Sequence, residues 1–231
     1  MDRRHLCRAL AGALALAPLA AVRAQSLAGI SDGDAGRGLK AALDMGAAAA
    51  VRLLGRPDGF LGNPQVRIQL PGSLREAAKL LKAMGQRQQV EELEVAMNRA
   101  AESAVPLARK LLQDAVRNMS VGDAKRILTG GETSVTQFFA DKTRQPLSGQ
   151  FLPVVKKATA KVGLAQKYDH VAGKAAGFGL VKQEDASIDH YVTRKALDGL
   201  YHVIGEEEKK IRRDPVGTGS ALLGKVFGAL R

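Results

Sequence analysis

The sequence has no tryptophan, few other aromatic residues and a single cysteine. Phe, Trp and Tyr make up 4% of the 231 residues, and Ala and Leu abound, which favours helices over a β-sandwich. Cys7 lies in an N-terminal segment that we expect to be removed, so the mature chain would have neither a disulfide nor a thiol nucleophile. No later apolar run reaches the roughly 20 residues of a membrane-spanning helix. These absences argue against a disulfide scaffold, thiol catalysis and a helical membrane domain.

Residues 1–24 have the three parts of an export signal peptide. A basic start that contains Arg3 and Arg4 precedes an apolar run over Ala9–Val22, and small residues lead to a cleavage point after Ala24. The run is too short to anchor the chain in a bilayer. The pattern therefore predicts a soluble protein of the bacterial periplasm, a compartment without nucleotide pools or genomic DNA.

The signal is compatible with two export routes. Arg3-Arg4-x-Leu6-x-Arg8 resembles the twin-arginine motif, whose cargo crosses the membrane already folded. The alternative is a general secretory signal that happens to carry two arginines. Cys7 precedes the apolar run, whereas a lipoprotein needs its cysteine directly after that run, so we expect no lipid anchor.

The chain is strongly basic, with 35 Lys and Arg against 23 Asp and Glu. Removal of residues 1–24 takes four Arg and one Asp, which leaves a net charge of about +9. In the envelope such a protein meets anionic lipids, lipopolysaccharide phosphates and acidic cell-wall peptides. Because the charges are spread along the chain without a dense basic block, we expect a solvated basic surface and no nucleic-acid partner, with polyanion binding as a rival function.

The spacing of apolar residues predicts an all-α protein, a single-domain bundle of about eight or nine helices over residues 25–231. Pro106 must kink or divide the long helical signal in which it lies. Alternating apolar residues predict one short strand or extended arm near residues 66–70. The first expected helix begins at the capping box Ser31-x-x-Asp34 and ends at Leu54. The others cover 73–84, 87–118, 121–129, a segment that starts at Ser134 around 138–139, 146–162, 164–174 and 185–213.

The C-terminal segment has its own pattern. Residues 214–219 form a linker rich in Gly, Thr and Ser, and residues 220–231 form a short amphipathic helix. Such a helix either docks on the body of the protein or makes a peripheral contact with a membrane surface.

Six segments, spread over nearly the whole mature chain, carry a family resemblance: 59–68 (GFLGNPQVRI), 97–106 (MNRAAESAVP), 123–128 (DAKRIL), 191–193 (YVT), 195–200 (KALDGL) and 206–212 (EEEKKIR). They resemble the domain of unknown function 4197 family of bacterial envelope proteins. The resemblance implies an exported, mostly helical protein. It brings no established activity, so it supplies neither a catalytic residue nor a cofactor.

One helical flank could hold a metal ion. Asp198, His202 and Glu206 follow one another at i, i+4 and i+8 within the expected 185–213 helix, so they stack along one side. Two carboxylates and an imidazole could ligate a divalent metal and leave a position open to water, as in a metal-dependent hydrolase. The alternative is a solvated charged flank, in which Glu206 pairs with Lys210.

A second candidate site is a polar network in an Ala-rich helix. Asn98, Arg99 and Glu102 lie just before Pro106 and need solvent or partners across the bundle. We expect the acidic run that includes Glu206 and Glu207 to pair with Arg99, and Lys210 or Arg212 to pair with Glu102. Such a network either fixes the helix register or, if it lines a cavity, binds an anionic or zwitterionic ligand. The candidate ligand-binding residues are Asn98, Arg99, Glu102, Glu206, Glu207 and Lys210.

Taken together, these patterns predict a soluble periplasmic helical protein that is a non-enzymatic binding or structural module. Its expected partner is an envelope component (an anionic lipid, the cell wall or a small ligand) or another protein, and no cofactor is expected. The alternative is the hydrolase that uses Asp198, His202 and Glu206. The oligomeric state stays open.

Overall fold

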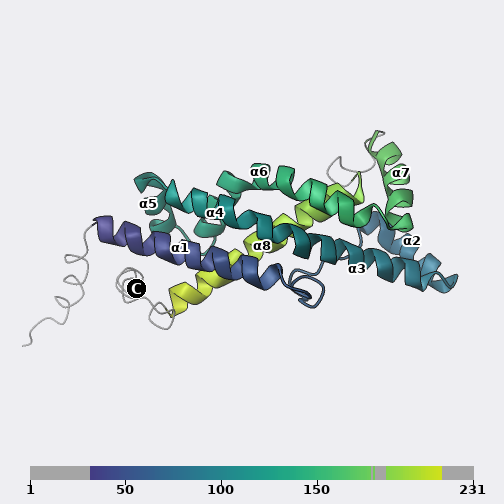
Figure 1. Ribbon diagram of the computed structural model, residues 1–231, viewed down its shortest axis with the longest axis horizontal. Coiled ribbons are helices and arrows are strands. Elements are labelled where there is room, and N and C mark those ends of the chain that lie inside the picture. The colour runs from purple at the N-terminus through teal and green to yellow at the C-terminus, as the bar shows by residue number, and fades with distance from the viewer. Residues whose placement is uncertain (1–31, 178, 180–185, 215–231) are drawn as a thin grey trace, which may run out of the picture.

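The structure is a computed structural model that describes residues 32–177, 179 and 186–214 (Figure 1). Within these ranges it has eight α-helices, one 3₁₀ turn and no strand, which confirms the all-α prediction. The expected signal peptide (1–24) and C-terminal helix (220–231) lie outside the described residues. The helices are α1 (Asp32–Leu54), α2 (Gly72–Ala83), α3 (Arg87–Ala104), η2 (Val105–Leu107), α4 (Ala108–Arg117), α5 (Val121–Thr129), α6 (Ser134–Thr159), α7 (Gly163–Gly177) and α8 (Ile188–Arg213).

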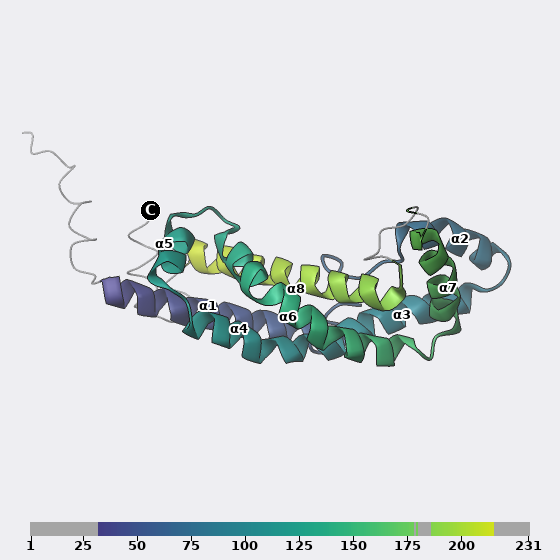
Figure 2. The ribbon, with the colours of Figure 1, turned by 90° about the horizontal axis from the view of Figure 1, so that it is seen from above.

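The long helices run side by side along an elongated bundle (Figures 1 and 2). Helices α3 and α4 follow one another along its length, and α6 and α8 lie beside them. Helix α1 packs against α4 and α8, while α2 and α7 lie at one end and α5 at the other. Helix α8 packs extensively on α6, α1 and α3 and so connects these three helices. None of the described helices combines the length and the apolar character that a membrane span needs.

Pro106 divides the long helical signal in two, as the sequence predicts. It lies in the 3₁₀ turn η2, between α3 and α4. Proline lacks an N–H and its ring clashes with the carbonyl one turn earlier, so the chain tightens into a 3₁₀ turn before the α-helix resumes.

Helix α6 corrects one prediction. The sequence predicts a break between a helix around residues 138–139 and another over 146–162, but α6 is continuous from Ser134 to Thr159 and contains Pro146 and Pro153. Both prolines lie on the exposed side, while Phe139, Leu147 and Phe151 are fully buried on the other. Burial of each such side chain contributes about 1.5–3 kcal/mol. This burial is of the same order as the roughly 3 kcal/mol that each proline costs inside a helix, so packing on the bundle offsets the missing hydrogen bonds.

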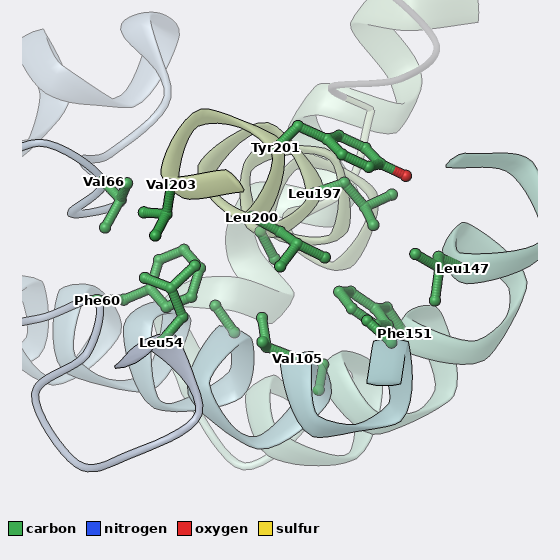
Figure 3. Packing of buried hydrophobic residues seen from close by; sticks show 14 of the residues in the cluster. Leu54, Phe60, Val66, Val105, Leu147, Phe151, Leu197, Leu200, Tyr201 and Val203 are labelled. Atoms are coloured by element: carbon green, nitrogen blue, oxygen red, sulfur yellow. The ribbon is translucent and has the colours of Figure 1, made fainter. Parts of the chain in front are cut away.

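The centre of the core lies along α8 (Figure 3). Two of its glycines allow unusually close approaches. A Cβ at Gly199 would lie 2.7 Å from the ring of Phe60, and a Cβ at Gly205 would lie 2.8 Å from Thr136 Oγ1. The buried side chains around α8 that Figure 3 labels are Leu54, Phe60, Val66, Val105, Leu147, Phe151, Leu197, Leu200, Tyr201 and Val203.

Residues 66–70, hereafter the arm, form no strand but keep the alternation that predicted one. Val66, Ile68 and Leu70 are buried, and the two residues between them are exposed. The partner of the arm is a side chain rather than a second strand. Ile68 donates its N–H to Asn98 Oδ1 (2.8 Å) and accepts from Asn98 Nδ2 at its carbonyl (2.9 Å). The side-chain amide of Asn98 thereby takes the place of one hydrogen-bonded residue on a neighbouring β-strand.

Candidate functional site

The expected polar network on α3 exists, but it has different partners. Oε1 of Glu102 accepts hydrogen bonds from the backbone N–H groups of Phe60 (3.0 Å) and Leu61 (3.1 Å). Oε2 accepts from Arg99 (2.7 Å), which also donates to Asp58 (2.8 Å). The hydrogen bond to Glu102 is the main reason that the pKa of Arg99 is raised, and the bond to Asp58 adds to it. With Asn98, these side chains fasten residues 58–68 to α3.

The expected pairing of α3 with the acidic run of α8 is wrong. Glu206 pairs with Lys209 (2.9 Å) and Glu207 with Lys210 (2.6 Å), each one turn along the same helix. The loop before the arm already supplies Glu102 with backbone donors, so it does not need a cation from α8. The six candidate ligand-binding residues therefore form two groups, and no hydrogen bond or ion pair among the described residues joins them.

The expected metal ligands do not form a metal site. Asp198 is paired with Arg144 (2.9 Å), Glu206 is paired with Lys209 and His202 is exposed. Within the described part of the chain, no three His, Cys, Asp or Glu side chains are placed to hold a metal ion. Helical spacing does put the three residues on one flank, but basic neighbours bind both carboxylates.

Asp198 instead lies close to two arginines, Arg144 on α6 and Arg194 on α8. Its carboxylate lies 2.9 Å from Arg144 and 3.9 Å from Arg194. The guanidinium of Arg144 lies over the ring of Tyr201 (5.0 Å), and that of Arg194 lies over Tyr191 (5.4 Å). These contacts fix both arginines at the α6–α8 groove, a hollow of about 480 Å³ that they line together with Asp141. Two carboxylates thus oppose the two guanidinium groups, so the groove is close to electrically balanced.

A second hollow, of about 370 Å³, is also balanced. It lies between α5 and the start of α6, and its charged lining residues are Asp123, Arg126, Asp141 and Lys142. Asp123 is already bound to Arg126 and to the N-cap Ser120. The Ser120 hydroxyl, the Ser120 N–H and Arg126 lower the pKa of Asp123 to about 2. The buried carboxylate of this hollow therefore stabilises the start of α5.

A third hollow, hereafter the arm groove, differs in charge from the two hollows above. This hollow of about 280 Å³ runs along the arm, between α2 and α8, and none of its described lining residues carries a carboxylate. Its cations are Arg67, Arg75 and Lys195. Arg67 lies 3.4 Å from Glu94, whereas Arg75 and Lys195 make no ion pair with any residue that the structure describes. Among the described side chains, two cations therefore face this groove without a counter-charge.

Tyr191 fixes the wall of the arm groove. Its hydroxyl donates to the carbonyl of Gln69 (2.9 Å), which joins α8 to the arm. The ammonium of Lys195 lies 6.0 Å from the centre of the Tyr191 ring, at the outer limit of a cation–π contact. Tyr191 and Lys195 thus lie side by side on the α8 wall of the groove.

Sequence reasoning missed this groove because its cations come from distant segments. Arg67 lies on the arm, Arg75 on α2 and Lys195 on α8. The alternation over residues 66–70 is a local signal, and it predicts the arm. No local pattern links the arm to Lys195, since that contact depends on how α8 packs.

The model of the family described as "Protein of unknown function (DUF4197)" matches residues 29–228. The chain belongs to the DUF4197 family. The match confirms the resemblance inferred from the six segments, and it covers every described residue. No curated protein and no solved structure matches the chain.

Proposed function

We propose that this DUF4197 protein is an exported, non-enzymatic binding module that takes an anionic ligand in the arm groove. The observation that supports the proposal is the charge of Arg75 and Lys195, which no carboxylate opposes among the side chains described around this hollow. The two larger hollows described above carry as many acidic as basic side chains at or next to their walls. Among the three, the arm groove gains most from the arrival of an anion.

The chemistry of the groove favours a phosphate or carboxylate group over a neutral ligand. Arg75 offers a planar guanidinium that can donate two parallel hydrogen bonds, and Lys195 offers a compact charge beside it. The polar backbone of the arm completes the wall. An exported protein meets such groups on lipids, on lipopolysaccharide and on cell-wall peptides. The signal-like residues 1–24, outside the described ranges, support export.

Absent nucleophiles support a binding role over catalysis. The mature chain has no cysteine, and none of its serines lies in a G-x-S-x-G motif. The carboxylates that could have held a metal are bound to basic side chains. The described lining of the arm groove contains no His, Asp, Glu or Cys, and its Tyr191 hydroxyl is bound to the carbonyl of Gln69.

Titration calorimetry with citrate and with inorganic pyrophosphate tests the proposal. We expect at least one anion to bind, with an affinity that falls as salt rises. The double variant Arg75→Ala/Lys195→Ala should weaken binding by about tenfold or more. The control Arg109→Ala/Lys125→Ala removes the same charges from exposed positions on α4 and α5. Equal losses in both double variants would show attraction to net charge alone and would refute the site.

Native mass spectrometry identifies the natural ligand class. The protein isolated from a periplasmic fraction is compared with its denatured mass, and we expect a stoichiometric anionic adduct. The Arg75→Ala/Lys195→Ala variant should lose this adduct, and the control should keep it. An adduct that persists in the variant would contradict binding in the arm groove.

A further inference from the structure

The arm presents an open backbone edge to the arm groove. Ile68 directs its N–H and C=O to Asn98 on α3. In an extended chain, successive residues direct these groups to opposite sides, so those of Arg67 and Gln69 face away from Asn98. The contact between the Gln69 carbonyl and Tyr191 on α8 agrees with this direction.

Two of the four groups on this edge are already bound within the protein. The N–H of Arg67 donates to the carbonyl of Asn63 (2.8 Å), and the carbonyl of Gln69 accepts from Tyr191. The carbonyl of Arg67 and the N–H of Gln69 make no hydrogen bond to any described residue. Both residues are exposed.

These two open groups have the spacing of a parallel β-ladder. In such a ladder, one residue of the incoming strand donates its N–H to the carbonyl of residue i−1 and accepts from the N–H of residue i+1. With Ile68 as residue i, the two groups are the carbonyl of Arg67 and the N–H of Gln69. A single residue of an extended peptide therefore satisfies both, opposite the rung that Asn98 supplies.

We propose that the anionic ligand of the arm groove is a short, extended acidic peptide that adds to the arm in parallel register. The proposal rests on the proposed function and names the ligand class. The open backbone groups bind the peptide main chain, and Arg75 and Lys195 bind its carboxylates. A hollow of about 280 Å³ suits a segment of a few residues rather than a folded domain. Peptides add to the edges of β-sheets in the same way, with affinity from the backbone and specificity from the side chains.

The probe is the blocked peptide acetyl-Glu-Glu-Glu-amide, titrated into the purified protein. Three analogues each carry one N-methyl group on a different glutamate nitrogen, which removes one donor and leaves the charge unchanged. We expect one of the three analogues to bind about tenfold more weakly and the other two to change by less than about threefold. Equal binding of all three would overturn the proposal, because attraction between charges alone does not depend on backbone donors.

A variant of the arm provides the complementary measurement. Gln69→Pro removes the open N–H, whereas Gln69→Ala removes only the exposed side chain. We expect the proline variant to bind acetyl-Glu-Glu-Glu-amide about tenfold more weakly and the alanine variant to bind it as the parent does. If the proline variant fails to fold, as its far-ultraviolet circular dichroism will show, the N-methyl series still decides the question.

The outcomes separate this inference from the proposed function. If citrate binds as tightly as the peptide and no N-methyl analogue is weakened, the anionic site stands and the peptide inference fails. If the peptide binds equally to the parent and to Arg75→Ala/Lys195→Ala, the proposed site itself fails. The inference holds when the peptide exceeds citrate in affinity and is sensitive both to one N-methyl group and to the double variant.

Discussion

The ring of Phe60 lies so close to Gly199 of α8 that a Cβ at residue 199 would come within 2.7 Å of its Cε1. Phe60 is fully buried, and its backbone N–H is bound to the buried Glu102. The loop that leads to the arm is therefore held from both sides, by a ring packed on α8 and by a carboxylate on α3. This double attachment positions the arm and its groove.

We expect Gly199→Ala to lower the free energy of unfolding by about 1–3 kcal/mol, because the new methyl group overpacks the contact with Phe60. The matched control is Gly149→Ala in α6, where a Cβ would meet nothing within 4 Å. That change should stabilise the protein by about 0.5–1 kcal/mol through helix propensity. Urea unfolding of both variants measures the two effects, and a neutral Gly199→Ala would contradict the tight contact.

Most helices could be predicted from the sequence because their signals are local. The apolar spacing of α1, the N-cap Ser120 of α5 and the proline between α3 and α4 all act within a few residues. The continuity of α6 could not be predicted, because it depends on the burial of side chains such as Phe151 against other helices, which cannot be seen in the sequence.

The candidate site could be predicted only in part, since it depends on contacts between distant segments. Asn98, Arg99 and Glu102 were recognised as polar residues in need of partners, and all three have them. Their partners were wrong, because Glu102 binds backbone N–H groups. Any N–H group can be such a donor, so no residue type in the sequence reveals it. The cations of the arm groove were missed for the same reason.

We expect Asn98→Ala to lower the free energy of unfolding by about 2–4 kcal/mol. Asn98 is fully buried, and its loss leaves both backbone groups of Ile68 without a partner. The exposed Asn118, at the end of α4, provides a control, because Asn118→Ala should change stability by less than about 0.5 kcal/mol. Equal urea midpoints for the two variants would show that the arm does not depend on Asn98.

The metal-dependent hydrolase makes a different prediction from the binding module. Because the carboxylates of Asp198 and Glu206 are bound to basic side chains, we expect Zn²⁺ or Mn²⁺ to leave the melting temperature within about 1 °C of the metal-free value. His202→Ala should not alter this result. A metal-dependent rise in the melting temperature that His202→Ala abolishes would support the hydrolase hypothesis.

The capping box of α5 makes the stability of the protein depend on pH. Asp123 has a pKa of about 2, below its usual value, because the Ser120 hydroxyl, the Ser120 N–H and Arg126 all favour the charged carboxylate. In the unfolded chain the pKa of an aspartate is about 3.9. The unfolded state therefore binds the proton first as the pH falls, and the stability that Asp123 contributes is complete above about pH 4 and is lost between about pH 4 and pH 2.

The variant Asp123→Asn isolates this contribution, because it cannot titrate. We expect the parent to be more stable than the variant at pH 6 and the difference between their urea midpoints to shrink as the pH is lowered from 4 towards 2. Asp44→Asn in α1 measures the effect of a lost carboxylate outside the capping box. A parent-to-variant difference for Asp123 that stays constant from pH 6 to pH 2 would mean that the capping interaction does not favour the charged form, contrary to the geometry of Ser120 and Arg126.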